Sequence, residues 1–569
     1  MREAVRSEAS VSIPIPMSSS SEDSVLHAFP SVGRSSRNGW LQTGLFVTIL
    51  FAYLLADGRT PPYTDAQQIY GVAEALVYRN SIQLPVGNGT GYASHPFLTS
   101  VIHVPATALR WALARNNPEL DRLLKPFASH FAGIVVASLG CLIFFRLLVY
   151  LGISASGASL ATAVLAFGTF LPIYGRSPWS ETSQATFFIG FYSALLRIRE
   201  SPRCKTALFF GLWTGLLVNS KYLFVAVLPG AILFLAYEAW RTRRIREFAR
   251  ASLWALPTGL PLLALILWYN WARTGTSTGT GYPTATNLVV TVFRENLLFG
   301  LWSQFFSLGK NIFFYNPPLV LAVFALPYVA RNHSKILWAL IVTAGPVLIL
   351  YGKFVYWSGD WCWGPRYLLF LVAPFLVLAC LHFGEYHRLK YRILMAGWTA
   401  MFLVGVWVQI AGASQYWDHY IRVSKIVQGE WLGNPNRRGA YVADRSGQCD
   451  PCFEDYYART YTPAFQPIEA HSWFLWHHLK SDPWLVAAKE MPLRRYTTLD
   501  FAILREWYER PPWDWWKLNF VGRYKATGNV LLAIFISGLF TGIGFLGYGL
   551  HRRRDASSAT VGQGSTDSS

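Results

Sequence analysis

The chain has 569 residues, of which 52% are hydrophobic, 16% are aromatic and only 14% are charged. A soluble globular protein carries roughly 25% charged residues, so this composition excludes a soluble protein and indicates a polytopic membrane protein. The net charge of +19 is therefore interpreted by where the basic residues lie relative to the membrane, and nucleic acid is not an expected partner.

The N-terminal residues 1–38 are rich in serine and poor in apolar residues, without helical or strand periodicity. We expect them to form a disordered cytoplasmic tail. Residues 41–56 form the first apolar span. Because this span lacks the small-residue cleavage site of a signal peptide, it is predicted to be a retained membrane anchor.

Residues 61–70 follow the first span directly, so they are expected to lie at a membrane surface. From Ile69 onward apolar residues recur at helical spacing, which predicts a helix lying in the interface. Asp65 at its start would be held beside the lipid headgroups, where an enzyme with a lipid-linked substrate needs a general base. The alternative is that Asp65 and Gln68 form a capping box.

Apolar segments predict about twelve membrane spans. They cover residues 41–56, 127–150, 158–174, 183–196, 206–219, 222–239, 251–270, 311–330, 336–352, 367–382, 393–411 and 529–550. Several are shorter than the usual ~20 residues, so some of these helices are expected to be broken or extended. Residues 551–569 are predicted to be a second disordered cytoplasmic tail.

Basic residues fall in clusters at 197–205, 241–250, 331–335, 388–392 and 552–554. All lie on the cytoplasmic side if both termini are cytoplasmic, as the positive-inside rule requires. The chain must then turn back near 219–221 on the outer side. The outer segments include a long first loop, 57–126, which is part of a transmembrane module spanning 39–411, and a soluble region, 412–528. The expected location is the plasma or inner membrane.

Acidic and basic residues stand in the first outer loop and at the outer ends of several predicted spans. They are Asp65, His95, Arg176, Glu181, Lys221, Lys310, Asp360 and Arg366. Cations at one membrane depth could hold a lipid phosphate or pyrophosphate, and an acid could deprotonate an acceptor hydroxyl or amine.

Each of these residues also has a structural alternative. The lysines and arginines could be snorkelling anchors at span ends. Glu181 could cap the next helix, and Asp360 could pair with Arg366. His95, which precedes Pro96, could cap or pack.

Cys449 and Cys452 form a Cys-x-x-Cys motif in a polar outer loop. The surrounding sequence shows no βαβ pattern for a redox site and no second ligand pair for a zinc site. We predict a disulfide between them on the oxidising face of the membrane.

This layout resembles the GT-C superfamily of polytopic glycosyltransferases, in the branch of bacterial aminoarabinose transferases and protein O-mannosyltransferases. The motifs that carry the resemblance are Asp65 after the first span and the runs 94–98, 176–181, 216–223, 309–318 and 363–367. Two positions depart from the family: a frequent Asp-Glu pair is Asp65-Ala66 here, and Asp360 stands where glycine is common.

The resemblance implies an all-α fold of about 12 transmembrane helices, with interfacial helices in the first outer loop and a small outer domain before the last span. It implies inverting transfer of a sugar from a polyprenyl-phosphate donor to a lipid, glycan or protein acceptor on the outer face. Asp65 would be the base and Glu181 a second acid. The leaving phosphate would be held by Lys221 and Arg366, helped by Lys310 or Arg176. Neither a metal ion nor a cofactor is implied.

Other classes of protein remain open at this point. A transporter or flippase would predict charged residues in mid-span and internal repeats, and no repeat is obvious in the sequence. In a non-catalytic scaffold, substitution of Asp65 would change stability and not turnover. Within the enzymes, a ligase or polymerase could move a whole oligosaccharide.

Overall fold

The structure is a computed structural model. It describes residues 39–59, 64–86, 89–280, 292–359, 362–383, 389–417, 419–420, 423–424, 466–493, 501–509 and 514–563. These residues are almost entirely helical, as predicted. The two described strands, β1 (Leu84–Val86) and β2 (Gly89–Gly91), form one antiparallel pair with Pro85 opposite Thr90.

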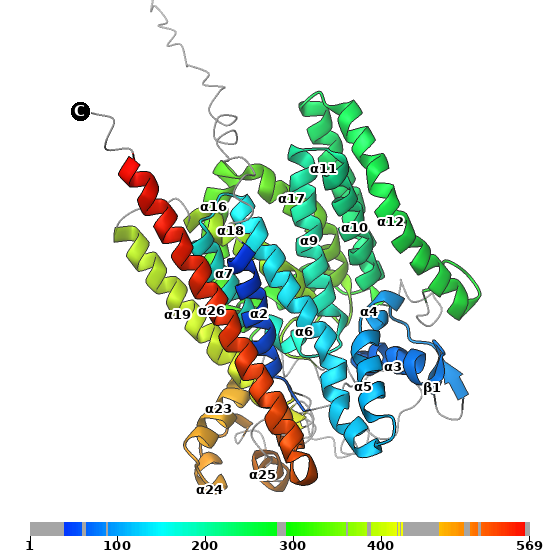
Figure 1. Cartoon of the computed structure of the whole chain (residues 1–569), viewed down its shortest axis with the longest axis vertical. Coiled ribbons are helices and arrows are strands. Elements are labelled where there is room, and N and C mark those ends of the chain that lie inside the picture. Colours follow the sequence, from blue (N-terminus) through cyan, green and yellow to red (C-terminus); the bar gives the residue numbers. More distant parts are fainter. Residues whose placement is uncertain are drawn as a thin grey trace, which may run out of the picture.

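The helices of the first half lie in the order shown in Figure 1. They are α2 (Gly39–Leu55), α3 (Thr64–Arg79), α4 (Phe97–Val101), α5 (Val104–Ala114), α6 (Pro118–Tyr150), α7 (Ala155–Phe167), α8 (Leu171–Gly175), α9 (Ser180–Glu200), α10 (Cys204–Ser220), η3 (Tyr222–Ala226), α11 (Val227–Arg241) and α12 (Ile245–Thr274).

The second half continues the bundle and ends with the long helix α26. Its helices are α14 (Leu297–Phe306), α15 (Ile312–Tyr315), η4 (Pro317–Leu319), α16 (Val320–Asn332), α17 (Ser334–Lys353), η5 (Arg366–Leu368), α18 (Leu369–Phe383), α19 (Leu389–Ser414), α23 (Pro467–Leu479), α24 (Trp484–Ala487), α25 (Phe501–Glu509), η9 (Trp516–Asn519), η10 (Gly522–Tyr524) and α26 (Lys525–Gln563).

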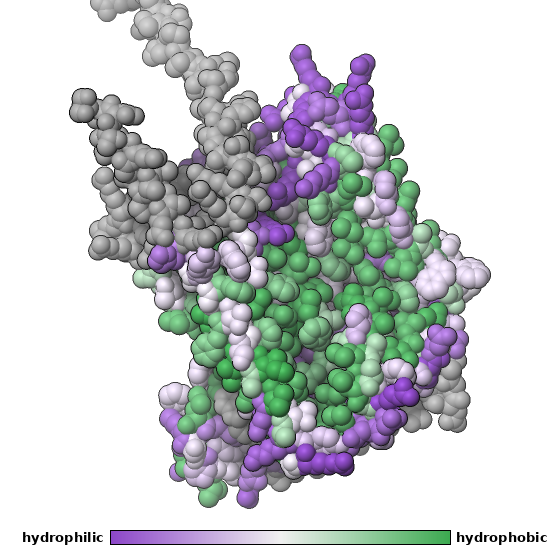
Figure 2. Space-filling view, viewed as in Figure 1, coloured by the Kyte–Doolittle hydropathy of each residue, from purple (hydrophilic) through white to green (hydrophobic). Residues whose placement is uncertain are grey.

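Seven helical segments of the described residues are long and apolar enough to cross a membrane. They are Phe97–Ala114, Pro118–Tyr150, Tyr222–Arg241, Ile245–Thr274, Ser334–Lys353, Met395–Ser414 and Gly522–His551. Four shorter apolar helices accompany them. Figure 2 shows the result on the surface, where an apolar band separates two hydrophilic ends. The number of about twelve spans stays a prediction.

The predicted span 158–174 is broken, because side chains occupy the hydrogen-bonding groups that a continuous helix would use. The Tyr53 hydroxyl donates to the carbonyl of Ala166 at 2.6 Å. The backbone N–H of Phe170 donates instead to the side chain of Asn316 at 2.9 Å. The chain therefore leaves the helix after Phe167.

The last helix also differs from the prediction, because α26 continues to Gln563 where a disordered tail was expected from residue 551. Residues 551–561 contain neither proline nor glycine, so no residue there stops the helix. Within the membrane region α26 packs closely on α2. A side chain at Gly44 would lie 2.6 Å from the backbone nitrogen of Leu546, so this packing depends on small residues.

Helix α9 runs through the interior, and every residue from Ser180 to Leu196 is buried. Its last turn carries Arg197 and Arg199. Arg244, from the second basic cluster, donates to the backbone carbonyl of Glu200 at 3.2 Å. The clusters at 197–205 and 241–250 therefore lie at one end of the bundle, and the polar first turn of α9 lies at the other.

The predicted periodic face of α3 is present, but protein covers it rather than lipid. Ile69, Val72 and Ala73 are fully buried, and α3 packs on α4, α5 and β1 (Figure 1). Arg110 of α5 joins α3 to α6 through a 2.7 Å ion pair with Glu74 and a second ion pair with Asp121. These contacts fix α3 at the end of the bundle that holds the first turn of α9.

Candidate functional site

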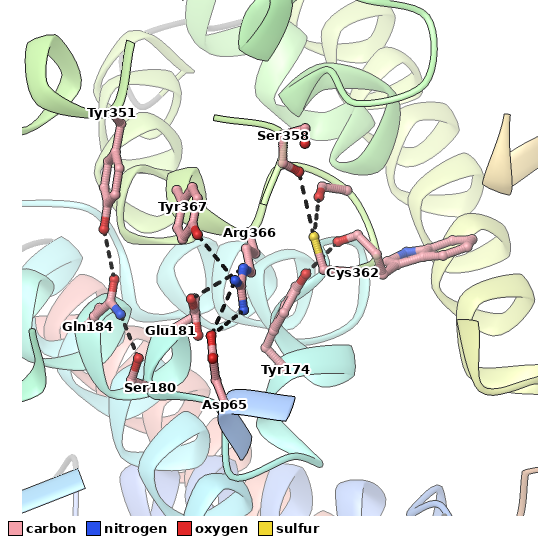
Figure 3. Close-up of polar contacts among 12 residues, drawn as sticks. Asp65, Tyr174, Ser180, Glu181, Gln184, Tyr351, Ser358, Cys362, Arg366 and Tyr367 are labelled. Atoms are coloured by element: carbon pink, nitrogen blue, oxygen red, sulfur yellow. Dashed lines mark hydrogen bonds and ion pairs between the residues drawn. The ribbon is translucent and has the colours of Figure 1, made fainter. Parts of the chain in front are cut away.

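Five of the residues predicted from the sequence meet at this end of α9. Asp65 comes from the first turn of α3, His95 precedes α4, and Glu181 lies in the first turn of α9. Lys221 lies in the turn between α10 and η3, which was predicted at 219–221, and Arg366 begins η5. Figure 3 shows Asp65, Glu181 and Arg366 pointing toward one another from these separate elements.

Arg366 is the centre of this cluster. Its Nη2 lies 3.4 Å from Asp65 Oδ2, and its Nε lies 3.7 Å from Glu181 Oε1. The guanidinium lies 4.1 Å from the centre of the Trp179 ring, and Nη2 donates to the Tyr367 hydroxyl at 3.1 Å. One buried cation is thus balanced by two carboxylates and held between two aromatic rings.

The loop before Arg366 needs unusual backbone geometry. Gly359 and Gly364 have φ of +74° and +69°, which other residues rarely adopt. The Nζ of Lys310 donates to the carbonyls of Cys362 and Gly364 at 2.7 and 3.3 Å. Lys310, predicted as a phosphate ligand, therefore holds the loop that places Arg366.

The two acids differ sharply in accessibility. The Asp65 side chain is 41% exposed, whereas that of Glu181 is 3% exposed. Burial raises the pKa of Asp65, but His95, 3.7 Å away, and the charges of Arg366 and Lys221 together hold this pKa well below its usual range. The Asp65 carboxylate is therefore ionised at neutral pH and accessible to a second molecule. The Glu181 carboxylate is buried next to Arg366.

Lys221 is the second cation of the site. Its Nζ lies 4.3 Å from the centre of the Tyr367 ring and 5.4 Å from that of Tyr351. Burial, only partly offset by Glu181 and Asp65, lowers the pKa of Lys221 to about 8. Among the described residues its ammonium group has no hydrogen bond and no ion pair within 4.0 Å, so its donors are available to a ligand.

Arg273 was not predicted from the sequence, and it joins the segment that holds His95 to Tyr222, the neighbour of Lys221. Its Nη1 donates to the carbonyls of Ala93 and His95 at 2.9 and 3.3 Å, and its Nη2 donates to the Tyr222 hydroxyl at 3.0 Å. Arg273 stands one turn after Asn270 at the end of an apolar helix, and that spacing was the available signal. Trp179 and Tyr367 were missed too, because aromatic residues at span ends are common in membrane proteins.

Arg273→Lys is expected to reduce turnover about tenfold or more, because an ammonium group cannot bridge acceptors on two segments as a planar guanidinium does. The His95 segment would then separate from Tyr222, the neighbour of Lys221. Turnover per folded molecule measures the effect. The matched control is Arg244→Lys, which loses a backbone contact at the opposite end of the bundle. Equal losses in both variants would contradict a role for Arg273 at the site.

The remaining predicted residues lie elsewhere. Arg176 donates to the carbonyls of Ala56 and Ala413 at 2.9 and 3.1 Å, and so joins the ends of α2 and α19. Asp360, Cys449 and Cys452 lie outside the described residues. Across the described part of the chain, no group of three or more His, Cys, Asp or Glu residues could hold a metal ion.

Comparison with solved structures finds similarity to ArnT from Cupriavidus metallidurans bound to undecaprenyl phosphate. The match has 12% sequence identity and a TM-score of 0.46, and it covers 92% of this chain and 80% of that chain. No protein-family profile and no curated protein matches the sequence.

Proposed function

We propose that this protein is a membrane glycosyltransferase that moves a sugar from a polyprenyl-phosphate donor to a lipid, glycan or protein acceptor. The observation that carries the proposal is the pairing of the exposed Asp65 carboxylate with Arg366, next to the available ammonium group of Lys221. A carboxylate that can take a proton and two cations that can hold a phosphate supply the two halves of such a transfer.

The cations act on the donor. When the bond between the sugar and the phosphate oxygen breaks, its electron pair and a full negative charge stay on the departing polyprenyl phosphate. Arg366 and Lys221 are fixed before the reaction by Trp179, Tyr367 and Glu181. Cations held in place in this way stabilise the developing charge without reorganisation.

Asp65 acts on the acceptor. It takes the proton of the attacking hydroxyl or amine as the new bond to the anomeric carbon forms, on the side opposite the phosphate, so the sugar is inverted. Arg366 and Lys221 help to keep the pKa of Asp65 low in the free protein. A phosphate bound between them would offset both charges, so donor binding raises that pKa and makes Asp65 a stronger base.

For Glu181 we propose a role different from that of the second acid that the resemblance implied. Its side chain is buried, and its Oε1 lies 3.7 Å from Arg366 Nε. We assign it as a positioning residue that compensates the charge of Arg366 and holds the guanidinium in place, and we assign the base to Asp65 alone.

We propose that the reaction takes place on the outer face of the membrane. The basic clusters at 197–205 and 241–250 mark the cytoplasmic end by the positive-inside rule, and the site lies at the other end of α9. The protein would thus be a multi-pass plasma or inner membrane protein with both termini cytoplasmic. The apolar band in Figure 2 would accommodate the polyprenyl chain.

The pH dependence of the reaction should report the charge on Lys221. Since its pKa is about 8, kcat/KM for the donor is expected to fall as the pH rises through that value, because neutral lysine no longer attracts phosphate. Lys221→Arg keeps the positive charge at every accessible pH, so the alkaline decline is expected to disappear. An unchanged decline in Lys221→Arg would assign it to another group.

The proposal is tested with purified protein in closed vesicles that contain a radiolabelled polyprenyl-phosphate sugar. A transferase releases free polyprenyl phosphate and transfers the labelled sugar to an acceptor or to water. A transporter moves the intact donor across the vesicle membrane and leaves the sugar–phosphate bond unbroken. Movement of intact donor, without any release of polyprenyl phosphate across the donors tried, would reject the proposal.

A further inference from the structure

We propose that Tyr367 is a positioning residue that joins the two cations of the site into one phosphate-binding unit. The inference rests on the proposed function and deepens it. The Tyr367 hydroxyl accepts a 3.1 Å hydrogen bond from Arg366 Nη2, while the centre of the Tyr367 ring lies 4.3 Å from Lys221 Nζ. The Arg366 guanidinium also lies 4.9 Å from the centre of the same ring, so this single side chain contacts both cations.

The ring is itself held in place. Tyr351 stacks on Tyr367 with ring centres 4.8 Å apart and an angle of 7° between the planes. The Tyr351 hydroxyl donates to Gln184 Oε1 at 3.4 Å, and Gln184 Nε2 donates to Ser180 Oγ at 2.9 Å. Figure 3 shows this chain of contacts leading from Tyr351 to the first turn of α9. The ring thus has a fixed relation to the helix that carries Glu181.

Tyr367 offsets the electrostatic repulsion between the two cations. Arg366 and Lys221 repel each other, and on flexible side chains they would move apart when no phosphate is present. The face of an aromatic ring carries partial negative charge and attracts the ammonium group. The hydroxyl accepts from the guanidinium at the same time. Both cations are therefore kept on one ring, ready for an anion that bridges them.

Two substitutions separate the hydrogen bond from the ring contacts. Tyr367→Phe removes the hydroxyl and keeps the ring, so the hydrogen bond from Arg366 is lost while the ring still lies beside both cations. Tyr367→Leu removes the hydrogen bond and the ring contacts to both cations. The difference between Phe and Leu therefore measures the ring, and it should depend on Lys221. The experiment compares the two variants in the wild type and in Lys221→Met, by equilibrium binding of polyprenyl phosphate to the purified full chain.

In the wild-type background we expect Tyr367→Phe to weaken binding of polyprenyl phosphate about threefold. We expect Tyr367→Leu to bind it about tenfold more weakly than Tyr367→Phe does. In the Lys221→Met background the difference between Phe and Leu is expected to become clearly smaller, because only the ring contact to Arg366 remains to be lost. The same Phe-to-Leu loss in both backgrounds, or wild-type binding by Tyr367→Leu, would overturn the inference. Tyr192→Leu is the control for loss of a buried tyrosine ring, because Tyr192 lies on α9 away from the first turn.

The Phe variant keeps the test decisive if Tyr367→Leu does not fold. Phenylalanine preserves the packing, and wild-type binding by Tyr367→Phe would then overturn the inference. The outcomes also separate this inference from the proposed function. Binding by the wild type that depends on Arg366 but not on Tyr367 rejects the inference alone. Failure of the wild-type protein to bind polyprenyl phosphate rejects the proposed function as well.

Discussion

Asp65→Asn is expected to lower turnover by a factor of about 100 to 10,000 while polyprenyl phosphate still binds. Asparagine has nearly the shape of aspartate and can also cap a helix, but it cannot accept the acceptor's proton. Arg366 keeps Glu181 as its buried partner, so its position is retained. Loss of the Asp65 charge leaves the site more positive, and donor affinity should be unchanged or higher.

The matched control for this prediction is Glu74→Gln. Glu74 lies on the same helix, α3, and is also paired with an arginine, Arg110. Glu74→Gln is expected to lower stability without changing turnover per folded molecule, because Glu74 does not contact Arg366 or Lys221. If Asp65→Asn and Glu74→Gln have equal turnover, Asp65 is a structural residue and the base must be sought elsewhere.

Arg366→Met is expected to abolish donor binding and to lower the free energy of unfolding by about 3–5 kcal/mol. The large loss of stability arises because Glu181 stays buried without its cation. Adding Glu181→Gln to Arg366→Met removes that buried charge. The double variant is therefore expected to regain much of the stability but none of the donor binding.

Thermal unfolding in detergent and binding of polyprenyl phosphate, measured on the same preparations, check both parts. A single variant as stable as the wild type would contradict the compensation of Glu181 by Arg366. Donor binding regained by the double variant would show that Arg366 acts only through stability and does not contact the phosphate.

Much of this architecture was predictable because it follows from local patterns. Apolar periodicity predicts α3, and the basic clusters at both ends of 206–239 predict the turn at Lys221, which the structure confirms. The side chains that meet at the site stand in the first outer loop or at predicted span ends, because an ionisable group is costly within the bilayer. The chemical type of a side chain and its expected depth in the membrane together therefore limited the candidate site residues to a short set.

The roles within that set depend on contacts between distant segments, which no local pattern encodes. Lys310 and Lys221 look alike in sequence, yet Lys310 donates to backbone carbonyls and Lys221 has no hydrogen bond to any described residue. Arg176 likewise donates to the ends of α2 and α19. The break of the predicted span 158–174 has the same origin, since it depends on Asn316, far away in the chain.

Lys221 and Arg366 are proposed to hold the donor phosphate beside Asp65. The most direct measurement is an experimental structure of the full chain in lipid with polyprenyl phosphate bound. We predict that the phosphate lies within hydrogen-bond distance of Lys221 Nζ and the Arg366 guanidinium. The Asp65 carboxylate should lie beside it and remain exposed to an acceptor. A phosphate bound at another group of basic residues, with Lys221 and Arg366 unoccupied, would contradict this account.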